Sequence, residues 1–439
     1  MRLRPLTVVG GVAAVLAAAA LTTGPLYRIR TWWSYEDPLR ADAFVVSVYV
    51  AIAVAGVVVL ATGRRWRRVD PVAGVLAVAL IAWLALGALW SDEPATTARE
   101  SVLAGGALVA GAGLASVVPG TIVLLVLWAG VHLGLAWSAV LIAARSPGTQ
   151  TTTGEWVGVY FNRNSLALYA ALGVLLCVLL LFEARRQLWT DGRQRVALTV
   201  LGLAAVADVV LLVQSRALTP MVALALAIVA TLAAAAARGA AWPRRRPGRA
   251  VSLAGAAVLA SALFVWVVRD PILSVAGRRS DLTGRVGLWD ASWEWLQERP
   301  LLGHGYLGAW SEDDFWRYLV ATNGRAFDSA HSSFVDVLLG GGWIGFVLFA
   351  AFVVGLYWTV ANQALATPGQ RRLWPLALFV FVLVENLVET LFVAGQLTVA
   401  ILGVLLVTRP PVAPPSTAPS LVEPDRRRNL RIAQTAAGP

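Results

Sequence analysis

The sequence predicts an all-α membrane protein with about twelve transmembrane helices, for three reasons. Of its 439 residues, 58% are hydrophobic and 14% are charged, whereas a soluble domain carries roughly 25% charged residues. Apolar runs of about 18 or more residues recur along the chain, and each is long enough to cross a hydrocarbon core of about 30 Å. Short arginine-containing segments separate many of these runs, and no lysine occurs. We therefore expect residues 1–408 to form one integral membrane domain.

The apolar runs give the boundaries of the expected spans. The first run follows Arg2 and Arg4 as in a signal peptide, but no convincing cleavage site follows it, so a retained helix is expected. A Pro-Gly pair at 119–120 provides the turn between the fourth and fifth spans. The twelve expected spans cover residues 6–24, 43–62, 72–90, 101–118, 121–143, 164–182, 196–214, 218–236, 250–268, 333–360, 373–393 and 395–408.

The arginines predict the orientation of these spans, because cytoplasmic loops are enriched in basic residues. With the N-terminus inside, most of the 36 basic residues fall in cytoplasmic segments, and an even number of spans places the C-terminus on the same side. Residues 409–439 are rich in Pro, Ser and Ala with a basic cluster, which predicts a disordered cytoplasmic tail. The net charge of +11 comes from arginines, which lie in short loops between the spans. This placement favours roles as topology signals and in phosphate contacts over nucleic-acid binding.

The longest segment between spans covers residues 269–332, between the ninth and tenth spans, on the extracytoplasmic side. Its stretch "TGRVGLWDASWEWLQERP" predicts a short helix that begins near Thr283 and ends at Pro300. Trp289, Trp293 and Leu296 share one face of this helix. That face suits the outer membrane interface, where Trp is favoured, and packing on the protein's own outer surface explains it equally well.

Three polar residues share the outer level of the membrane in this topology. Arg216 lies in "VQSRALTP" between the seventh and eighth spans, Arg285 lies in the long loop, and His331 lies in "SAHSS" where the tenth span begins. Two arginines can hold a diphosphate through charge-assisted hydrogen bonds without losing their protons. A histidine can accept a proton from a hydroxyl near neutral pH. The set suits displacement of a pyrophosphate leaving group by a sugar hydroxyl, with the arginines stabilising the charge that develops.

Each of the three residues also has a purely structural interpretation. Arg216 can extend to lipid headgroups, Arg285 can brace the loop, and His331 can belong to the start of the tenth span. Their shared membrane face favours a common site, because three independent structural residues need not lie on one side.

Other polar residues at this level are candidates for substrate binding. Arg163 and Asn164 mark the outer start of the sixth span, although Asn164 also fits a helix N-cap. Ser332 and Trp289 are further candidates in the long loop. Glu389 shares a helix face with Glu385, and its place near the outer end of the eleventh span would let it orient His331 or an arginine.

The remaining polar residues are expected to be structural. His132 and Asp208 are interpreted as buried, hydrogen-bonded residues within spans, although ionisable groups in a membrane are functional candidates by default. Cys177 is the single cysteine and lies in the middle of a span, so no disulfide framework exists and packing is its expected role. His304 in "GHGY" is expected to stabilise the long loop.

Several local patterns, in this order, resemble the O-antigen ligase/polymerase superfamily of bacterial membrane glycosyltransferases, over about residues 155–395. They are "YFNRNSLALYAALG", "VQSRALTP", "LTGRVGLWDASWEWLQERPLLGHGY", "AHSSFVDVLLGGGWIGF" and "ENLVETLF". By motif position the resemblance implies that Arg216, Arg285 and His331 are the essential residues. It also implies a GT-C-like helical fold and transfer without a metal. One departure is that "GGGWIG" lacks the acidic residue that many members carry before the glycine.

The resemblance and the polar residues together predict a glycosyltransferase of the bacterial cytoplasmic membrane. It would transfer a polyprenyl-diphosphate-linked glycan to an acceptor hydroxyl outside the membrane, as an O-antigen ligase does, with no cofactor and no metal. The expected partners are this donor, a glycan or glycolipid acceptor and membrane lipid, with envelope-assembly proteins as candidates and no nucleic acid. The alternatives are a glycan polymerase of the same superfamily and a twelve-span transporter or flippase of lipid-linked glycans.

Overall fold

The computed structural model describes residues 5–31, 43–160, 162–187, 191–237, 285–324, 327–365, 372–392 and 396–408. These residues form helices joined by turns. The helices are α1 (Pro5–Ala20), α2 (Gly24–Thr31), α3 (Ala43–Ala61), α4 (Pro71–Leu86), α5 (Pro94–Val117), α6 (Gly120–Ala143), α7 (Arg163–Gln187), α8 (Asp191–Ser215), α9 (Leu218–Ala237), α13 (Arg285–Leu296), α14 (Asp313–Asn323), α15 (Ser333–Leu365), α16 (Trp374–Val388) and α17 (Leu397–Leu405).

The all-α membrane class is confirmed. Within the described ranges, eight helices are long and apolar enough to cross a membrane, and α1 and α16 are shorter apolar helices. The eight cover residues 43–61, 71–89, 94–117, 120–143, 163–182, 195–215, 218–237 and 333–364. The number twelve stays a prediction, because the ninth expected span (250–268), the start of the long loop (269–284) and the tail (409–439) lie outside the described residues.

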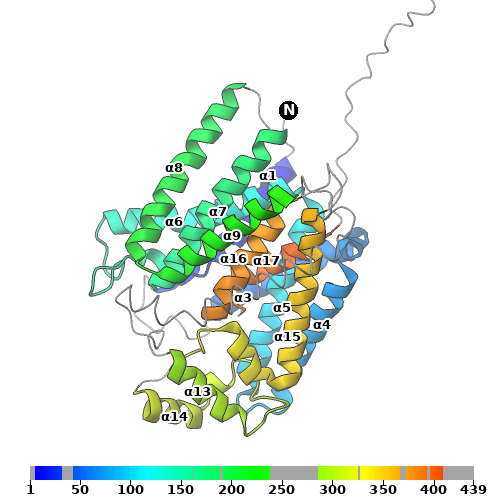
Figure 1. The fold of residues 1–439 in the computed structure, drawn as a ribbon, viewed down its shortest axis with the longest axis vertical. Coiled ribbons are helices and arrows are strands. Elements are labelled where there is room, and N and C mark those ends of the chain that lie inside the picture. The colour runs from blue at the N-terminus through cyan, green and yellow to red at the C-terminus, as the bar shows by residue number, and fades with distance from the viewer. Residues whose placement is uncertain are drawn as a thin grey trace, which may run out of the picture.

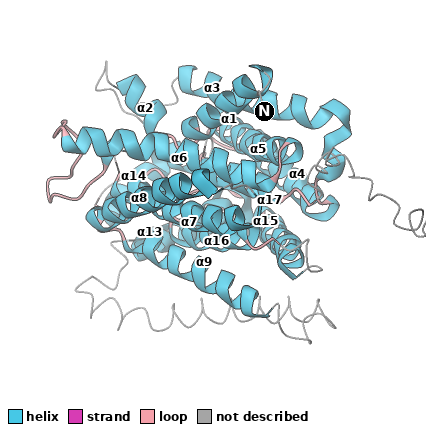
Figure 2. Ribbon diagram, turned by 90° about the horizontal axis from the view of Figure 1, so that it is seen from above, coloured by secondary structure: helices cyan, strands magenta, loops and turns pink. Residues whose placement is uncertain are grey.

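The helices form one bundle with a buried centre. Figure 2 shows α7, α16 and α17 in the middle of the bundle, surrounded by the other helices. All nine residues of α17 are buried, whereas α4 and α8 expose large apolar side chains such as Val75 and Leu203. Apolar side chains on the outside of a helix bundle are stable where they face hydrocarbon, and the backbone groups are satisfied within each helix. The peripheral helices therefore present the surface that a bilayer requires.

The helices of the long loop gather at one end of the bundle. Figure 1 shows α13 and α14 together below the end of α15, on the side opposite the marked N-terminus. The expected short helix is confirmed as α13, which packs against α14 and α15. Leu296 is buried in this contact, whereas Trp293 is half exposed and lies edge-on to Trp343. The sequence allowed two explanations for this helix face, and packing on the protein's own surface therefore accounts for most of it.

Glycines of α15 connect this end of the bundle to the loop that follows α13. The helix is interrupted at Gly342, whose φ of 62° and ψ of −168° are far from helical values. A Cβ at this position would overlap the carbonyl of Leu301. The close approach allows backbone hydrogen bonds from His304 N to Leu339 O (3.0 Å) and from Trp343 N to Pro300 O (2.9 Å). Gly340 and Gly342 of "GGGWIG" therefore allow a backbone contact that a side chain at either position would block.

Small residues also bring α5 and α17 together at the centre of the bundle. A Cβ added to Gly403 would overlap the carbonyl oxygen of Leu108, and one added to Gly111 would overlap that of Ala400. In a bilayer, helix association depends on close packing, which small residues permit.

The substitution Gly403→Val should therefore destabilise the folded protein in detergent by about 1–3 kcal/mol or more, because two backbones would have to separate. The measurement is the melting temperature followed by fluorescence-detected gel filtration. The matched control is Gly202→Val on α8, where an added Cβ meets no atom within 4 Å. Equal melting temperatures for the two variants would contradict the close α5–α17 contact.

Candidate functional site

The carboxylate of Glu389 lies at the end of α16 and contacts three side chains from distant parts of the chain. Its Oε1 accepts hydrogen bonds from Arg285 Nη2 at 2.5 Å and from Asn164 Nδ2 at 2.8 Å. Its Oε2 lies 3.5 Å from His331 Nδ1. We call these four residues the Glu389 cluster. The structure thus brings together four of the side chains that the sequence singled out.

Arg285 is held by the end of α16 at two points. It is the first residue of α13, and its Nη1 also donates to the carbonyl of Val388. Glu389 has an extended backbone (φ −142°, ψ 150°), so α16 ends at Val388 and its last carbonyls are available to partners. The Arg285 side chain is 15% exposed and that of Glu389 is 14% exposed. A largely buried ion pair of this kind is costly to break from one side, because a single charge would remain.

His331 is placed by the segment that precedes α15. Its φ of 50° is in the left-handed region, which histidine and asparagine tolerate better than most residues. The neighbouring residue Ser333 fastens this segment to the end of α16, since its Oγ accepts hydrogen bonds from the amides of Leu391 (2.9 Å) and Phe392 (3.0 Å). The strained backbone conformation of His331 is therefore maintained by the contact between the start of α15 and the segment that follows α16.

Asp336 and Thr390 complete this support, and the sequence analysis did not identify either. The buried Asp336 carboxylate accepts hydrogen bonds from the Ala330 amide (2.9 Å) and from the Thr390 hydroxyl. The pattern "SFVD", with an acidic residue three positions after Ser333, is a known signal for the start of a helix and would have pointed to Asp336. Both residues position the backbone that carries His331.

Trp289 and Ser332 lie beside the cluster, although they do not reach Glu389. The indole of Trp289 donates to the carbonyl of Ala330 at 2.8 Å, which links α13 to the segment before His331. Ser332 is 2% exposed, and its carbonyl accepts from the amide of Asp336 at 2.9 Å. In this structure both residues therefore support the position of His331.

Arg163 and Asn164 are neighbours in sequence but take different partners. Arg163 pairs with Glu155 (Nη1 to Oε1, 3.1 Å) in the loop between α6 and α7. Hydrogen bonds from the hydroxyls of Thr151 and Thr153 lower the pKa of Glu155 to about 2, so it is ionised at neutral pH. The cap of α7 is the side chain of Asn162, which accepts from the amide of Asn164 at 2.8 Å. The Asn164 side chain is therefore available for Glu389, and its interpretation as a helix cap is wrong.

Arg216 lies in the turn between α8 and α9, with an exposed side chain and a φ of 53°. Its amide donates to the carbonyl of Val213 at 3.1 Å, which closes the turn. The helix that follows, α9, packs against both α16 and α7. Arg216 thus lies just before a helix that packs against α16 and α7, which carry Glu389 and Asn164 of the cluster.

Glu385 and His304, two other polar residues that the sequence singled out, are not members of the Glu389 cluster. Glu385 is fully buried one turn before Glu389, and neither of its carboxylate oxygens has a hydrogen-bond partner among the described residues. His304 is buried in the loop after α13, where its Nε2 lies 2.9 Å from the carbonyl of Trp295. Burial lowers the pKa of His304, so it is neutral at physiological pH and suits the loop-stabilising role expected for it.

The fold and this cluster define a multi-pass helical membrane protein with a shared polar site at one end of its bundle. Residues 219–350 match the family model described as O-antigen ligase. This part of the chain therefore carries the O-antigen ligase family segment, and the resemblance suggested by the motifs is confirmed. The matched segment includes Arg285 and His331, whereas Asn164 and Glu389 lie outside it.

A curated relative is the exopolysaccharide production protein ExoQ of Rhizobium meliloti. It is 26% identical to this chain over 225 residues, which cover 49% of this chain and 48% of the relative. The match therefore spans about half the length of each protein.

The cluster predicts that Glu389→Gln loosens the segment before α15, because a neutral amide holds a guanidinium and an imidazole more weakly than a carboxylate does. Hydrogen bonds to charged groups contribute about 1.5–3 kcal/mol, and part of this should be lost. Hydrogen exchange of the backbone amides of residues 327–336 should become faster. The control is Glu298→Gln at an exposed position of the same loop. Unchanged exchange in both variants would show that Glu389 does not hold this segment.

Proposed function

We propose that the protein is a membrane glycosyltransferase that moves a polyprenyl-diphosphate-linked glycan onto an acceptor hydroxyl at the extracytoplasmic face. The family segment at 219–350 supports glycosyl transfer as the reaction class. The observation that carries the proposal is the convergence of Arg285 and His331 on Glu389. This convergence supports the proposal, because an anion-binding Arg285 beside a proton-accepting His331 would suit the displacement of a diphosphate.

In this proposal His331 is the general base. Its Nδ1 faces the Glu389 carboxylate, and a carboxylate partner favours the tautomer with the proton on that nitrogen. The Nε2 atom then carries the lone pair that accepts the proton of the acceptor hydroxyl. The acceptor oxygen bonds to the anomeric carbon as the bond from that carbon to the diphosphate oxygen breaks. A displacement in one step inverts the anomeric centre.

Arg285 and Arg216 would stabilise the diphosphate that leaves. A guanidinium has five N–H donors in a planar fork, so Arg285 can keep its bonds to Glu389 and Val388 and still present further donors to phosphate oxygens. Arg216 is exposed in the turn before α9 and supplies a second permanent positive charge. Asn164 would hold the Glu389 carboxylate in place, and Arg163, Trp289 and Ser332 would line or support the substrate pocket. The two arginines supply the positive charge, so the proposed transfer uses neither a metal nor a cofactor.

We place the cluster on the extracytoplasmic side of the bacterial cytoplasmic membrane, with both termini in the cytoplasm. The distribution of arginine between loops supports this orientation. The gathering of α13 and α14 at the end of the bundle opposite the N-terminus is compatible with it (Figure 1). The donor lipid, the acceptor glycan or glycolipid and the surrounding lipid would meet at this end.

The proposal predicts that the purified protein transfers glycan in vitro from a polyprenyl-diphosphate donor and that two substitutions reduce the rate. Arg285→Lys should reduce it on the order of 10²–10³-fold, because lysine lacks the planar fork. His331→Asn should reduce it on the order of 10²–10⁴-fold, because asparagine tolerates the left-handed backbone but cannot act as a base. Product formation by the purified variants is the measurement.

Arg317→Lys is the matched control for arginine, since Arg317 is an exposed residue of α14 paired with Asp314. Wild-type rates for both the Arg285 and the His331 variants would refute these roles. Movement of the donor lipid across a vesicle membrane without any glycosidic bond would instead support a transporter.

A second candidate function is polymerisation of the glycan itself. It is favoured by the relative's name, which refers to exopolysaccharide production, where a growing glycan can serve as acceptor. Deletion of the protein separates the two possibilities through the size of the envelope glycans. A polymerase predicts shortened chains, because repeat units are no longer joined. A ligase predicts full-length chains that stay on the lipid carrier.

A further inference from the structure

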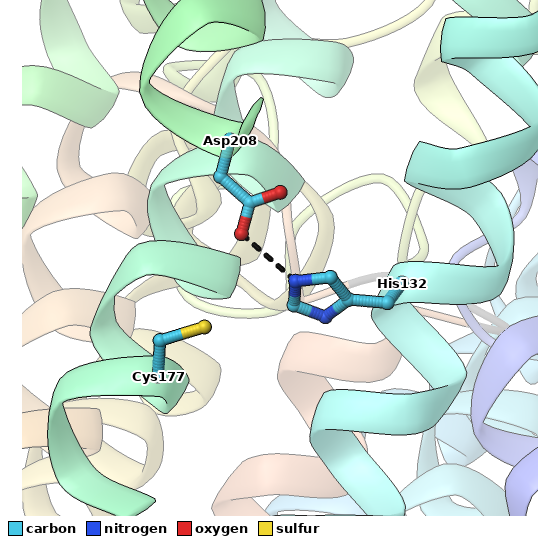
Figure 3. A group of neighbouring side chains, drawn as sticks. All are labelled: His132, Cys177 and Asp208. Atoms are coloured by element: carbon cyan, nitrogen blue, oxygen red, sulfur yellow. Dashed lines mark hydrogen bonds and ion pairs between the residues drawn. The ribbon is translucent and has the colours of Figure 1, made fainter. Parts of the chain in front are cut away.

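Three helices inside the bundle each direct one metal-ligating side chain to the same buried point. His132 of α6, Cys177 of α7 and Asp208 of α8 offer ligand atoms that all lie within 4.8 Å of one another (Figure 3). Cys177 is fully buried and Asp208 is 1% exposed. Each of these helices is long and apolar enough to span a membrane. Ionisable groups in such a place call for a specific physical reason, because burying them unpaired is costly.

Each nitrogen of the His132 ring lies close to an oxygen atom. The ring Nδ1 lies 2.8 Å from the carbonyl oxygen of Trp128, which can only accept, so Nδ1 carries a hydrogen. The ring Nε2 lies 2.9 Å from Asp208 Oδ2. In a neutral imidazole of this tautomer, Nε2 is an acceptor, and two acceptors at this distance repel each other. A proton or a metal ion must therefore lie between these two atoms.

The thiol of Cys177 supplies a third ligand, which a metal ion can use and a proton between His132 and Asp208 cannot. A thiolate and a carboxylate together carry two negative charges, and a neutral histidine adds none, so a divalent ion would make the group electrically neutral. Neutrality matters in a low-dielectric interior, where net charge is strongly disfavoured. Zn²⁺ binds Cys sulfur, His nitrogen and Asp oxygen, with bonds of about 2.0–2.3 Å, whereas Mg²⁺ and Ca²⁺ prefer oxygen alone.

The surroundings are arranged to bring these ligands together. Gly173 lies one turn before Cys177 on α7, and a Cβ there would overlap Asp208 Oδ2, so glycine lets the carboxylate reach α7. The indole of Trp128 donates to Cys177 Sγ at 3.2 Å, and its carbonyl fixes the His132 ring. Hydrogen bonds to the ligands from outside the coordination sphere are a regular feature of metal sites.

We propose that His132, Cys177 and Asp208 bind one Zn²⁺ ion that clamps α6, α7 and α8 together. On binding, the Cys177 thiol gives up its proton, and the proton shared by His132 and Asp208 is also released. The ion takes no part in glycosyl transfer. Its effect on the outer site is structural, because α7 begins beside Asn164 and α8 ends at the turn that carries Arg216.

The test uses the full-length protein purified in detergent and titrated with Co²⁺, a probe that occupies zinc sites and gives a thiolate charge-transfer absorption. Cys177 is the single cysteine of the chain, so this absorption can arise from no other residue. The wild type should show the band at about one Co²⁺ per chain, and Zn²⁺ should abolish it by competition. Zn²⁺ should also raise the melting temperature of the wild type.

Three variants define the ligands. Cys177→Ser should abolish the band, and Asp208→Asn should weaken Co²⁺ binding at least tenfold. Gly173→Ala removes no ligand but should also weaken binding at least tenfold, because it displaces the Asp208 carboxylate. Glu312→Gln is the control, since Glu312 belongs to a separate group of metal-ligating residues with Asp92 and His304.

The wild-type titration decides the question even where a variant fails to fold. A wild type that shows no thiolate band at saturating Co²⁺ would overturn the proposal. So would a melting temperature that Zn²⁺ raises equally in the wild type and in Cys177→Ser, because the ion would then bind elsewhere.

Discussion

A single carboxylate, that of Glu389, joins the distant parts of the chain that form the Glu389 cluster. An ionised carboxylate only accepts hydrogen bonds and has room for about four donors, so it can bind a guanidinium, an amide and an imidazole at once. These partners come from the starts of α7 and α13 and from the segment before α15. The arrangement requires α16 to end at Val388, because a continued helix would point the Glu389 side chain along the helix surface.

The segments that carry the partners of this carboxylate are held largely by hydrogen bonds to backbone groups, which explains the unusual residues nearby. Gly342 interrupts α15 so that the loop after α13 can form backbone hydrogen bonds with it. His331 holds a left-handed conformation that costs on the order of 1–3 kcal/mol. Asp336 binds the backbone amide of Ala330, directly before His331, and Ser333 binds the backbone amide of Leu391 in the segment after α16, so this conformation is held by both contacts. Helices and turns that are fastened in this way hold the side chains of the Glu389 cluster in fixed positions.

The bundle contains a second polar group, and α7 connects it to the first. Asn164 at the start of this helix contacts Glu389, while Cys177 further along it lies beside His132 and Asp208. The hydrogen bond between His132 and Asp208 links α6 directly to α8 across α7. The positions of α7 and α8 therefore depend on a polar contact within the membrane, and those helices carry Asn164 and the Arg216 turn. Polar contacts of this kind limit how helices can slide in a bilayer, where the hydrophobic effect gives no preference between apolar surfaces.

Hydropathy and motifs were enough to predict the class of fold and to single out the four residues of the Glu389 cluster. Helical spans follow from hydropathy because a bilayer leaves no other way to satisfy the backbone, and the motifs around Arg285 and His331 marked the polar residues at the outer level. Only the tertiary structure decided how they pair. Glu389 is separated from Arg285 by 104 positions and from Asn164 by 225, and local periodicity holds no information about contacts over such distances. The same reason explains why only the structure could show that three residues expected to be structural, His132, Cys177 and Asp208, share one point inside the bundle. The cap of α7 is a local feature, and two asparagines so close together, Asn162 and Asn164, left it open in the sequence.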